Sequence, residues 1–199
     1  MRFSFTCICK RHPHLAGRKK NKDDDKWVYL PSLRTTRRIG SGDRSKPFVG
    51  SEFTYNDMGR RKITDDKHEM VNPNVSVTIS SKDFGSFTYN CWQIKETPIP
   101  SKAKEVEYAY RHYWIDKKTY MPVKIQNFDK KGTLLKTMVI EKLEQTKGIK
   151  GTYQVRRAVN VVNEKTKRVT HLWIKDYKWD QKVSTSYFTQ QWLITGKIK

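Results

Sequence analysis

Cysteine and histidine side chains gather near the N-terminus, in the segment Cys7-Ile-Cys9-Lys-Arg-His12-Pro-His14. Thiolate and imidazole groups are the usual ligands of zinc, which makes this segment the first candidate for chemistry. Its spacing, C-x-C-x₂-H-x-H, is tighter than the usual zinc arrangements, and no hairpin signal accompanies it. We therefore predict no metal site.

Other reactive side chains stand apart from one another along the chain. Cys91 lies within an expected strand and has no histidine near it in sequence, so we expect a small buried side chain rather than a nucleophile. His112 and His171 fall on separate expected strands, and the Asp23–Asp25 run lies among lysines, as solvated loop carboxylates do. The sequence contains no G-x-S-x-G, H-E-x-x-H, P-loop or G-x-G-x-x-G motif. We expect no catalytic residues, no enzyme activity and no cofactor.

Length and composition are those of one globular domain: 199 residues, 36% hydrophobic and 31% charged. No window approaches the roughly 18 apolar residues that a membrane-spanning helix needs, and the three cysteines give no disulfide framework. The excess of 41 basic over 20 acidic residues gives a net charge of +21. Such a charge favours contact with polyanions, either nucleic acid or an anionic lipid surface. The alternative is a solubilising surface without a partner.

The first 22 residues differ in composition from the rest. They hold seven of the 41 basic residues and no Asp or Glu. The apolar run Phe3–Cys9 is short, and Lys10 and Arg11 follow at once, so it does not read as an export signal. By that criterion alone the chain would stay in the cytoplasm. We expect residues 1–22 to be an atypical basic lead-in and residues 23–199 to form the functional domain.

From Trp27 onward, hydrophobic residues recur with a period of two. Val75, Val77 and Ile79 alternate with polar residues, which is the pattern of a half-buried strand. Similar runs follow along the chain, and in one of them Lys136 interrupts the apolar face. Some runs are hydrophobic on both faces, as around residues 89–94. This favours a sheet that wraps an apolar cavity and is also covered elsewhere, or else a β-bulge that shifts the phase within one strand.

The residues between these runs carry the chemistry of hairpin turns. Asp129–Gly132 places a glycine where a left-handed residue is often needed, and Asn163–Lys167 separates two further strands. Short connections force successive strands to be antiparallel. The pattern predicts a mainly β fold, a long antiparallel meander that curls on itself, with short helical turns at Phe53–Met58 and Tyr187–Leu193.

The segment DDDKWVYLPSLRTTRRIGSGDRSKPFVGSEFTYNDM resembles the signature of the LolA-like outer-membrane lipoprotein-sorting family. That signature is an acid-rich lead-in, then W-x-Y-L-P, an R-R-I strand and an F-x-G-S-[DE]-F-x-Y-x-D block. The segments CWQIKETP, YWIDKKTYMPVKIQNFDKKG and YFTQQWL follow in the expected order, so the resemblance extends from about Asp23 to the end. The matching positions of the first segment are Trp27, Tyr29, Leu30, Pro31, Arg37, Arg38, Ile39, Phe48, Gly50, Ser51, Phe53, Tyr55 and Asp57.

The resemblance implies an incomplete antiparallel β-barrel, a LolA/LolB-like half-barrel, with short plug helices around a hydrophobic cavity. Such proteins are periplasmic carriers of the Gram-negative cell envelope that shield the acyl chains of lipoproteins or other lipids between the inner and outer membranes. The implied partners are those acyl chains, an inner-membrane transporter and, transiently, a membrane surface. No nucleic acid and no covalent chemistry are implied.

Alternation along the strands, combined with the resemblance, assigns expected roles to individual residues. Arg37 and Arg38 point to opposite faces of one strand, so one of them would contact a lipid head group or the membrane; plain surface charge is the alternative. The expected lipid-cavity residues are Trp27, Tyr29, Leu30, Ile39, Phe53, Tyr55, Trp92, Ile94, Tyr108, Tyr110, Trp114, Ile125, Met138 and Ile140.

The chain departs from the family pattern before the W-x-Y-L-P motif. Family members have a signal peptide, a helix and several strands there, whereas this chain has 26 residues. We expect residues 1 to about 20 to be a mistranslated or frameshifted lead-in of an N-terminally truncated member. Two alternatives to the carrier remain. One is a single-strand nucleic-acid binder that stacks bases on aromatic residues of the strands, namely Tyr108, Tyr110, Trp114, Trp173 and Trp179. The other is a non-functional fragment or purely structural module.

Overall fold

The computed structural model describes residues 7–10, 25–30, 34–59, 61–182 and 184–195. The chain divides into two compact units: residues 1–44 together with 181–199, and residues 45–180. The predicted division into a lead-in of residues 1–22 and a domain of residues 23–199 stays a prediction. No helix among the described residues is long and apolar enough to cross a membrane.

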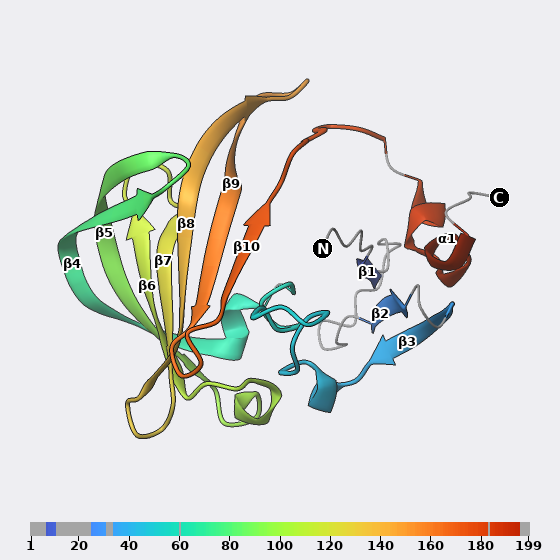
Figure 1. The fold of residues 1–199 in the computed structure, drawn as a ribbon, viewed down its shortest axis with the longest axis horizontal. Coiled ribbons are helices and arrows are strands. Elements are labelled where there is room, and N and C mark those ends of the chain that lie inside the picture. The colour runs from blue at the N-terminus through green and yellow to red at the C-terminus, as the bar shows by residue number, and fades with distance from the viewer. Residues whose placement is uncertain (1–6, 11–24, 31–33, 60, 183, 196–199) are drawn as a thin grey trace. The chain divides into compact units, whose positions relative to one another are not determined.

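The first unit is built on a small antiparallel sheet (Figure 1). Its strands β1 (Cys7–Lys10), β2 (Asp25–Leu30) and β3 (Thr35–Ile39) lie in the order β1-β2-β3. The 3₁₀ turn η1 (Ser41–Asp43) follows, and the C-terminal part adds η4 (Thr185–Phe188) and the helix α1 (Gln190–Thr195). Helix α1 contacts both β2 and β3. Val28, Ile39 and Leu193 are buried side chains of this unit.

The second unit is one seven-stranded antiparallel sheet, whose strands pair in sequence order from β4 to β10 (Figure 1). The sheet does not close, yet it curls far enough for β4 to contact β8. This confirms the predicted meander and incomplete barrel. The strands are β4 (Asp66–Ser81), β5 (Gly85–Pro98), β6 (Tyr110–Asp116), β7 (Pro122–Phe128), β8 (Leu134–Lys147), β9 (Thr152–Asn163) and β10 (Val169–Trp173), with 3₁₀ helices η2 (Ile63–Asp65) and η3 (Ala103–Glu105).

The predicted hairpin turns form where their chemistry placed them. Asp129 Oδ1 accepts hydrogen bonds from the backbone N–H groups of Lys131 and Thr133, both at 2.8 Å. Gly132 has a φ of 81°, a left-handed conformation that glycine adopts without steric cost. The side chain of Asn163 likewise accepts from the backbone of its own turn. Side-chain acceptors therefore hold both turns and align the strands on either side.

The two predicted helical turns differ from each other. Tyr187–Leu193 falls on η4 and α1. Phe53–Met58 forms no helix: Thr54 makes an isolated antiparallel bridge with Pro47. Residues 55–58 form hydrogen-bonded turns, in which the Met58 N–H donates to the Thr54 carbonyl at 3.2 Å. Thr54 also makes a local side-chain hydrogen bond, in which its backbone N–H donates to Asp57 Oδ2 at 2.7 Å. Such side-chain bonds compete with a regular helix, which explains why this segment does not extend into one.

Strand β5 is covered on both faces without a phase shift in its pairing to β6. Its register with β6 is continuous from Cys91 to Glu96. Opposite this stretch the extra residues belong to β4, which advances from Met70 to Val75 while β5 advances only from Ile94 to Cys91. Further register shifts lie on the pairings from β6 to β9. Bulges bend strands and increase their twist, so these positions account for the curl of the sheet. The sequence offered two explanations for the apolar residues on both faces of this strand: coverage of both faces, or a β-bulge within the strand. The continuous register of β5 with β6 favours coverage of both faces.

Two hydrophobic clusters cover the sheet. One contains Phe53, Ile140, Val159 and Val161, so the turns of residues 53–58 pack onto β8 and β9. The other contains Cys91, Trp114 and Val123, with Val75, Val77 and Tyr89 against it. Leu143 packs against both clusters. Burying one such large apolar side chain contributes about 1.5–3 kcal/mol, so these clusters hold the curled sheet together.

A strap after β10 is pinned to the turn between β8 and β9. The ring of Trp179 stacks on Tyr153, with centroids 4.6 Å apart, and its Nε1 donates to Thr146 Oγ1 at 2.7 Å. Asp180 accepts from the Tyr153 hydroxyl at 2.6 Å and from the Lys150 N–H at 2.7 Å. Gly148 lies beneath these groups, and the strap has room to pack only because residue 148 lacks a side chain.

Replacing Gly148 by alanine should therefore destabilise the sheet unit. A Cβ there would lie 2.7 Å from Asp180 Oδ2 and 2.8 Å from Trp179 Cβ. We expect Gly148→Ala to lower the free energy of unfolding by about 1–3 kcal/mol, as overpacking does. Gly151→Ala, in the same turn but with nothing within 4 Å of its added Cβ, is the matched control and should change it by less than about 0.5 kcal/mol. Urea denaturation of both variants decides; equal stabilities would refute the steric argument.

The thiol of Cys91 should be unreactive in the folded protein. The residue is 0% exposed, and burial, with Asp116 nearby, raises its thiol pKa from 9.0 to about 11. Iodoacetamide at pH 8 should leave Cys91 unmodified in the native protein and alkylate it in urea, as read by peptide mass. Because the folded chain keeps this proton to higher pH than the unfolded chain, stability should fall as pH rises from about 9 toward 11. Native alkylation at the unfolded rate would contradict this placement.

Candidate functional site

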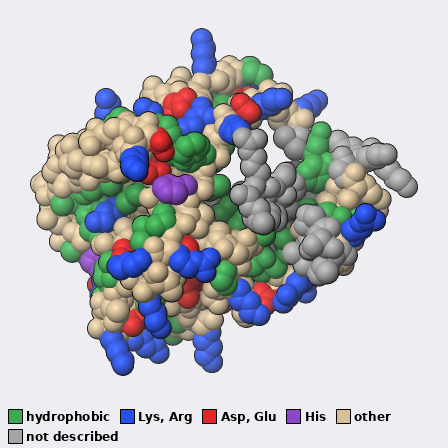
Figure 2. All heavy atoms as spheres, viewed as in Figure 1, with side chains coloured by type: hydrophobic (Ala, Val, Ile, Leu, Met, Phe, Trp, Pro, Cys, Tyr) green, Lys and Arg blue, Asp and Glu red, His purple; other side chains and the backbone are tan. Residues whose placement is uncertain are grey.

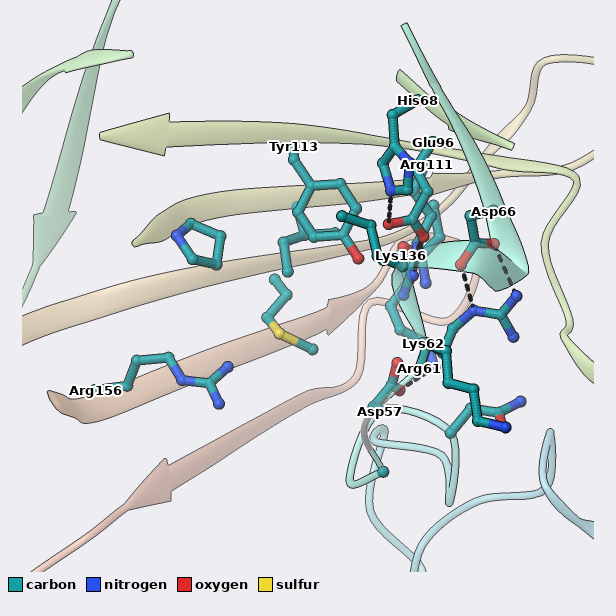
Figure 3. A pocket seen from close by; sticks show the side chains of 17 residues that line it. Asp57, Arg61, Lys62, Asp66, His68, Glu96, Arg111, Tyr113, Lys136 and Arg156 are labelled. Carbon is teal, nitrogen blue, oxygen red and sulfur yellow. Dashed lines mark hydrogen bonds and ion pairs between the residues drawn. The ribbon is translucent and has the colours of Figure 1, made fainter. Parts of the chain in front are cut away.

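A cavity of about 380 Å³ lies over one face of the seven-stranded sheet, where the turns and η2 of residues 56–66 border it (Figure 3). Its volume is in the range of small-molecule binding pockets, about 300–1,000 Å³. The strands β4 to β9 supply the remaining walls. The lining residues are Asn56, Asp57, Gly59, Arg61, Lys62, Ile63, Asp66, His68, Glu96, Arg111, Tyr113, Pro122, Ile125, Asn127, Lys136, Met138 and Arg156.

The strand register arranges the cavity face in two parallel rows. One row is apolar: Tyr113 pairs with Ile125, and Ile125 pairs with Met138. The other row is polar and lies two residues further along each strand, which keeps it on the same face. It reads His68, Glu96, Arg111, Asn127 and Lys136, each paired with the next across β4 to β8. The cavity is therefore amphipathic, with an apolar part beside an ionic part.

The ionic part is held by cross-strand ion pairs. Arg111 donates from Nε (2.9 Å) and from one terminal nitrogen to Glu96 Oε1, and His68 Nε2 lies 3.4 Å from Glu96 Oε2. Arg61 makes a two-pronged contact with Asp66, at 2.8 and 2.7 Å. Dashed lines in Figure 3 mark these contacts. Charge-assisted, two-pronged bonds of this kind fix geometry as well as neutralising charge.

Two tyrosine rings enclose the guanidinium of Arg111. Its Cζ lies 4.4 Å from the ring centroid of Tyr108 and 5.0 Å from that of Tyr113. Burial alone would lower the pKa of Arg111, but Tyr113, Tyr108 and Glu96 raise it above the usual arginine value. Burial also raises the pKa of both tyrosines. The centre of the ionic part is thus a permanently charged arginine between neutral aromatic rings.

Lys136 joins a second ionic group. Its Nζ lies 3.4 Å from Asp57 Oδ2 and 3.7 Å from Glu107 Oε1. Two carboxylates thus share one ammonium. Burial and the neighbouring Asp57 raise the pKa of Glu107 above its usual range. Asp57 closes the family-like F-x-G-S-[DE]-F-x-Y-x-D block, so this part of the sequence signature lies in the cavity wall.

The predicted lipid-cavity residues of the sheet unit fall into several environments. Ile125 and Met138 line the cavity, and Ile94 pairs with Tyr113 of the apolar row. Phe53 and Ile140 lie in one hydrophobic cluster and Trp114 in the other. The remaining four contact other rings or cations: Tyr55 with Phe48, Trp92 with Tyr120, Tyr110 with Phe128, and Tyr108 with Arg111.

The other predicted residues belong to the first unit. Trp27 and Tyr29 are half-buried on β2, Ile39 is buried at the end of β3, and the Leu30 side chain lies outside the described residues. Arg37 and Arg38 are exposed, and Arg37 pairs with Asp43 at 3.3 Å. The Cys7–His14 segment also lies outside the described side chains. Among those described, no group of His, Cys, Asp and Glu could hold a metal ion.

Charged residues of the cavity were not predicted as site residues. Glu96 lies in the family-like segment CWQIKETP but was given no role there. The others belong to none of the segments on which the resemblance rests: Arg61, Asp66, His68, Arg111 and Arg156. The one available signal was Lys136, which interrupts an apolar strand face. A charged residue at such a position is costly to bury unless it is paired, and here its partner Asp57 lies 79 positions away in sequence. That separation is why strand patterning did not find the pair.

Breaking the Arg111–Glu96 pair should be strongly destabilising. Both side chains are only 11% exposed, so Arg111→Leu would leave a buried carboxylate without its arginine. We expect a loss of about 3–5 kcal/mol in urea denaturation, with part of it recovered in the double variant Arg111→Leu, Glu96→Leu. The control is Lys67→Ala, which removes the pair with Glu69 on the exposed side of β4, 71% and 45% exposed. It should cost at most about 1 kcal/mol. Similar losses in Lys67→Ala and Arg111→Leu would show that the Arg111 pair is not essential.

Comparison with known proteins places this fold. Among curated proteins, none matches the sequence. A domain from Vibrio parahaemolyticus described as an outer membrane lipoprotein-sorting protein is 26% identical, with a TM-score of 0.71 over 87% of this chain and 67% of its own. A DUF1329 family protein from Desulfovibrio piger is 22% identical, with a TM-score of 0.69 over 86% and 65%. The LolA superfamily protein NE2245 from Nitrosomonas europaea is 20% identical, with a TM-score of 0.57 over 85% and 68%.

The chain thus spans about two thirds of the length of these structures. At 22% and 20% identity, the Desulfovibrio piger and Nitrosomonas europaea proteins show similarity of fold alone. A family model, described as an uncharacterized protein, matches residues 12–195, which is most of the chain. Together with the meander, the incomplete barrel and the lined cavity, this match means that the chain belongs to that family, DUF1329, and is LolA-like.

Proposed function

We propose that this protein is a carrier that shields an acyl chain of a lipid or lipoprotein from water and releases it unchanged. The observation that carries the proposal is the amphipathic cavity on the face of a LolA-like sheet. Its apolar row, Tyr113, Ile125 and Met138, offers a surface for methylene groups. The adjoining ion pairs keep the other part of the cavity polar. A carrier needs only such a surface and no covalent step.

The energetics of acyl burial are sufficient for this role. Each methylene removed from water contributes about 0.8 kcal/mol. A chain of a dozen methylenes would supply on the order of 10 kcal/mol before the entropic costs of binding are subtracted. The binding free energy that remains after this subtraction is small enough for the lipid to be released to an acceptor, yet large enough to hold it in transit. Reversible capture therefore follows from surface burial alone.

The similarity to an outer membrane lipoprotein-sorting domain supports a periplasmic location, with an inner-membrane transporter as donor. Transient contact with an anionic membrane fits the net charge of +21, since each Lys or Arg near such a surface contributes about 1 kcal/mol. On the face shown in Figure 2, Lys and Arg side chains project from many positions on the sheet unit, with carboxylates between them. This distribution suits weak, reversible attraction to a surface.

Polar substitution in the apolar row should weaken acyl binding. Met138→Gln keeps the length of the side chain but places an amide where the acyl chain would lie. We expect the affinity for a fluorescent fatty acid to fall about tenfold, because apolar contact is lost and the amide is desolvated. Met70→Gln is the matched control, because Met70 is 56% exposed and does not line the cavity. Its affinity should stay that of the unmodified protein.

The outcome that would overturn the carrier is equally concrete. Organic extracts of the purified protein should contain acyl lipid by mass spectrometry, and the fatty acid should compete with it. If the protein binds neither, while it binds single-stranded oligonucleotides with a steep salt dependence, the nucleic-acid alternative replaces the carrier. Equal loss of binding in the Met138→Gln and Met70→Gln variants would show that the acyl site lies elsewhere.

A further inference from the structure

The cavity carries more positive than negative charge. Its lining contains the cations Arg61, Lys62, Arg111, Lys136 and Arg156. Three of them are matched by the three lining carboxylates: Arg61 by Asp66, Arg111 by Glu96 and Lys136 by Asp57. Within the part of the chain that the structure describes, Lys62 and Arg156 form no ion pair. The lining therefore has two cations to spare.

A β-bulge aims Arg156 into the cavity. On β9, Ala158 pairs with Lys142 and Arg156 pairs with Leu143, so the register skips Arg157. The skipped residue reverses the alternation and brings Arg156 to the face of Val159 and Val161. Without the bulge, alternation from Val159 would turn Arg156 to the opposite face. Bulges next to binding sites commonly re-aim a side chain in this way.

Arg157, the bulged residue, is itself firmly anchored. Its Nε and one terminal nitrogen donate to Glu144 at 2.7 and 2.9 Å. Its other terminal nitrogen donates to the carbonyls of Ile174, at 2.6 Å, and of Lys175. The hydrogen bond from Arg157 lowers the pKa of Glu144, which keeps this carboxylate charged. Arg157 thus fixes the bulge, while the guanidinium of Arg156 has no hydrogen bond or ion pair with another described residue.

The two spare cations differ in their surroundings. In Figure 3, Arg156 reaches in from β9, well apart from the ion pairs, whereas Lys62 lies beside Asp57 and Arg61. At the ionic end, Asp57, Asp66 and Glu96 already occupy a cation each, so an anionic ligand there would have to compete with them for those cations. No lining carboxylate adjoins Arg156 in that view. An anionic group would therefore be held at the Arg156 end, beside the apolar row.

We propose that the cavity takes an anionic amphiphile, with its tail along the Tyr113–Ile125–Met138 row and its phosphate or carboxylate bound by Arg156. This inference rests on the proposed carrier function and specifies its cargo. A guanidinium presents a planar fork of donors that matches two oxygens of such a group. The ligand class is thus a singly or doubly charged lipid rather than a neutral one.

The test compares two amphiphiles with the same tail, dodecyl phosphate and dodecyl maltoside, titrated below their micelle concentrations by calorimetry. We expect the protein to bind the phosphate more tightly. Arg156→Gln should lower the affinity for dodecyl phosphate by about tenfold to a hundredfold, the usual effect of losing a charge-assisted pair, and leave the maltoside unaffected. Arg168→Gln makes the same charge change at a site that does not line the cavity and should alter neither.

Other results would overturn either the anionic cargo or the carrier function, and the two can be told apart. If the maltoside binds as well as the phosphate, or Arg156→Gln weakens both equally, the anionic cargo is wrong and the carrier survives. If neither amphiphile binds, the carrier falls as well. Titration of inorganic phosphate alone separates the two sources of the anion. If inorganic phosphate binds as tightly as dodecyl phosphate, and Arg156→Gln lowers both affinities by the same factor, the site holds free phosphate and not a lipid.

Discussion

Buried charged side chains on the cavity face must be paired, because an isolated buried ion costs far more than a fold of this size can spare. The two unpaired cations of the lining, Lys62 and Arg156, are exposed. This constraint ties together parts of the chain that are distant in sequence. Glu96 and Arg111 bind β5 to β6, and Lys136 of β8 binds the turn that carries Asp57. Arg61 bonds to Asp66 at the start of β4. The ion pairs thereby hold the covering segment of residues 56–66 against the sheet and keep the cavity in shape.

The bulges are the second determinant, since they decide both the curl of the sheet and the direction of single side chains. Shifts of register between β4 and β5 and from β6 to β9 bend the strands. The same kind of irregularity at Arg157 turns Arg156 to the cavity side. A regular sheet with this sequence would have a flatter inner face and a differently charged cavity. Curvature and ligand chemistry thus share one cause.

The cavity combines two properties that suit a reversible carrier. Its apolar row would bind methylene groups with an energy proportional to the number buried, and its matched ion pairs would add little attraction of their own. An unmatched arginine beside the apolar row would then supply orientation. Because the paired cations already bind carboxylates of the protein, they would attract the anionic head group less than the unpaired arginine does. In the proposed function, this is how cargo would be positioned without being held permanently.

The sequence by itself determined the order of the strands, their antiparallel pairing and the position of the turns. Period-two alternation and short turn segments such as Asp129–Gly132 are local properties, and local sterics and hydrogen bonds act on them directly. The family resemblance singled out Phe53, which packs onto β8 and β9, and Asp57, which lies in the cavity wall. These parts could be predicted because each depends on neighbours in sequence.

Only the tertiary structure decided which of the aromatic and charged residues meet at the cavity. The pairing of Lys136 with Asp57 joins distant segments. The enclosure of Arg111 depends on the placement of Tyr108, which precedes β6, as well as on Tyr113 within that strand. Arg156 would have been placed on the wrong face by alternation, because a single skipped residue at position 157 reverses it. A bulge leaves no clear signal in composition, and its effect on a side chain's direction is known only once the partner strand is in register.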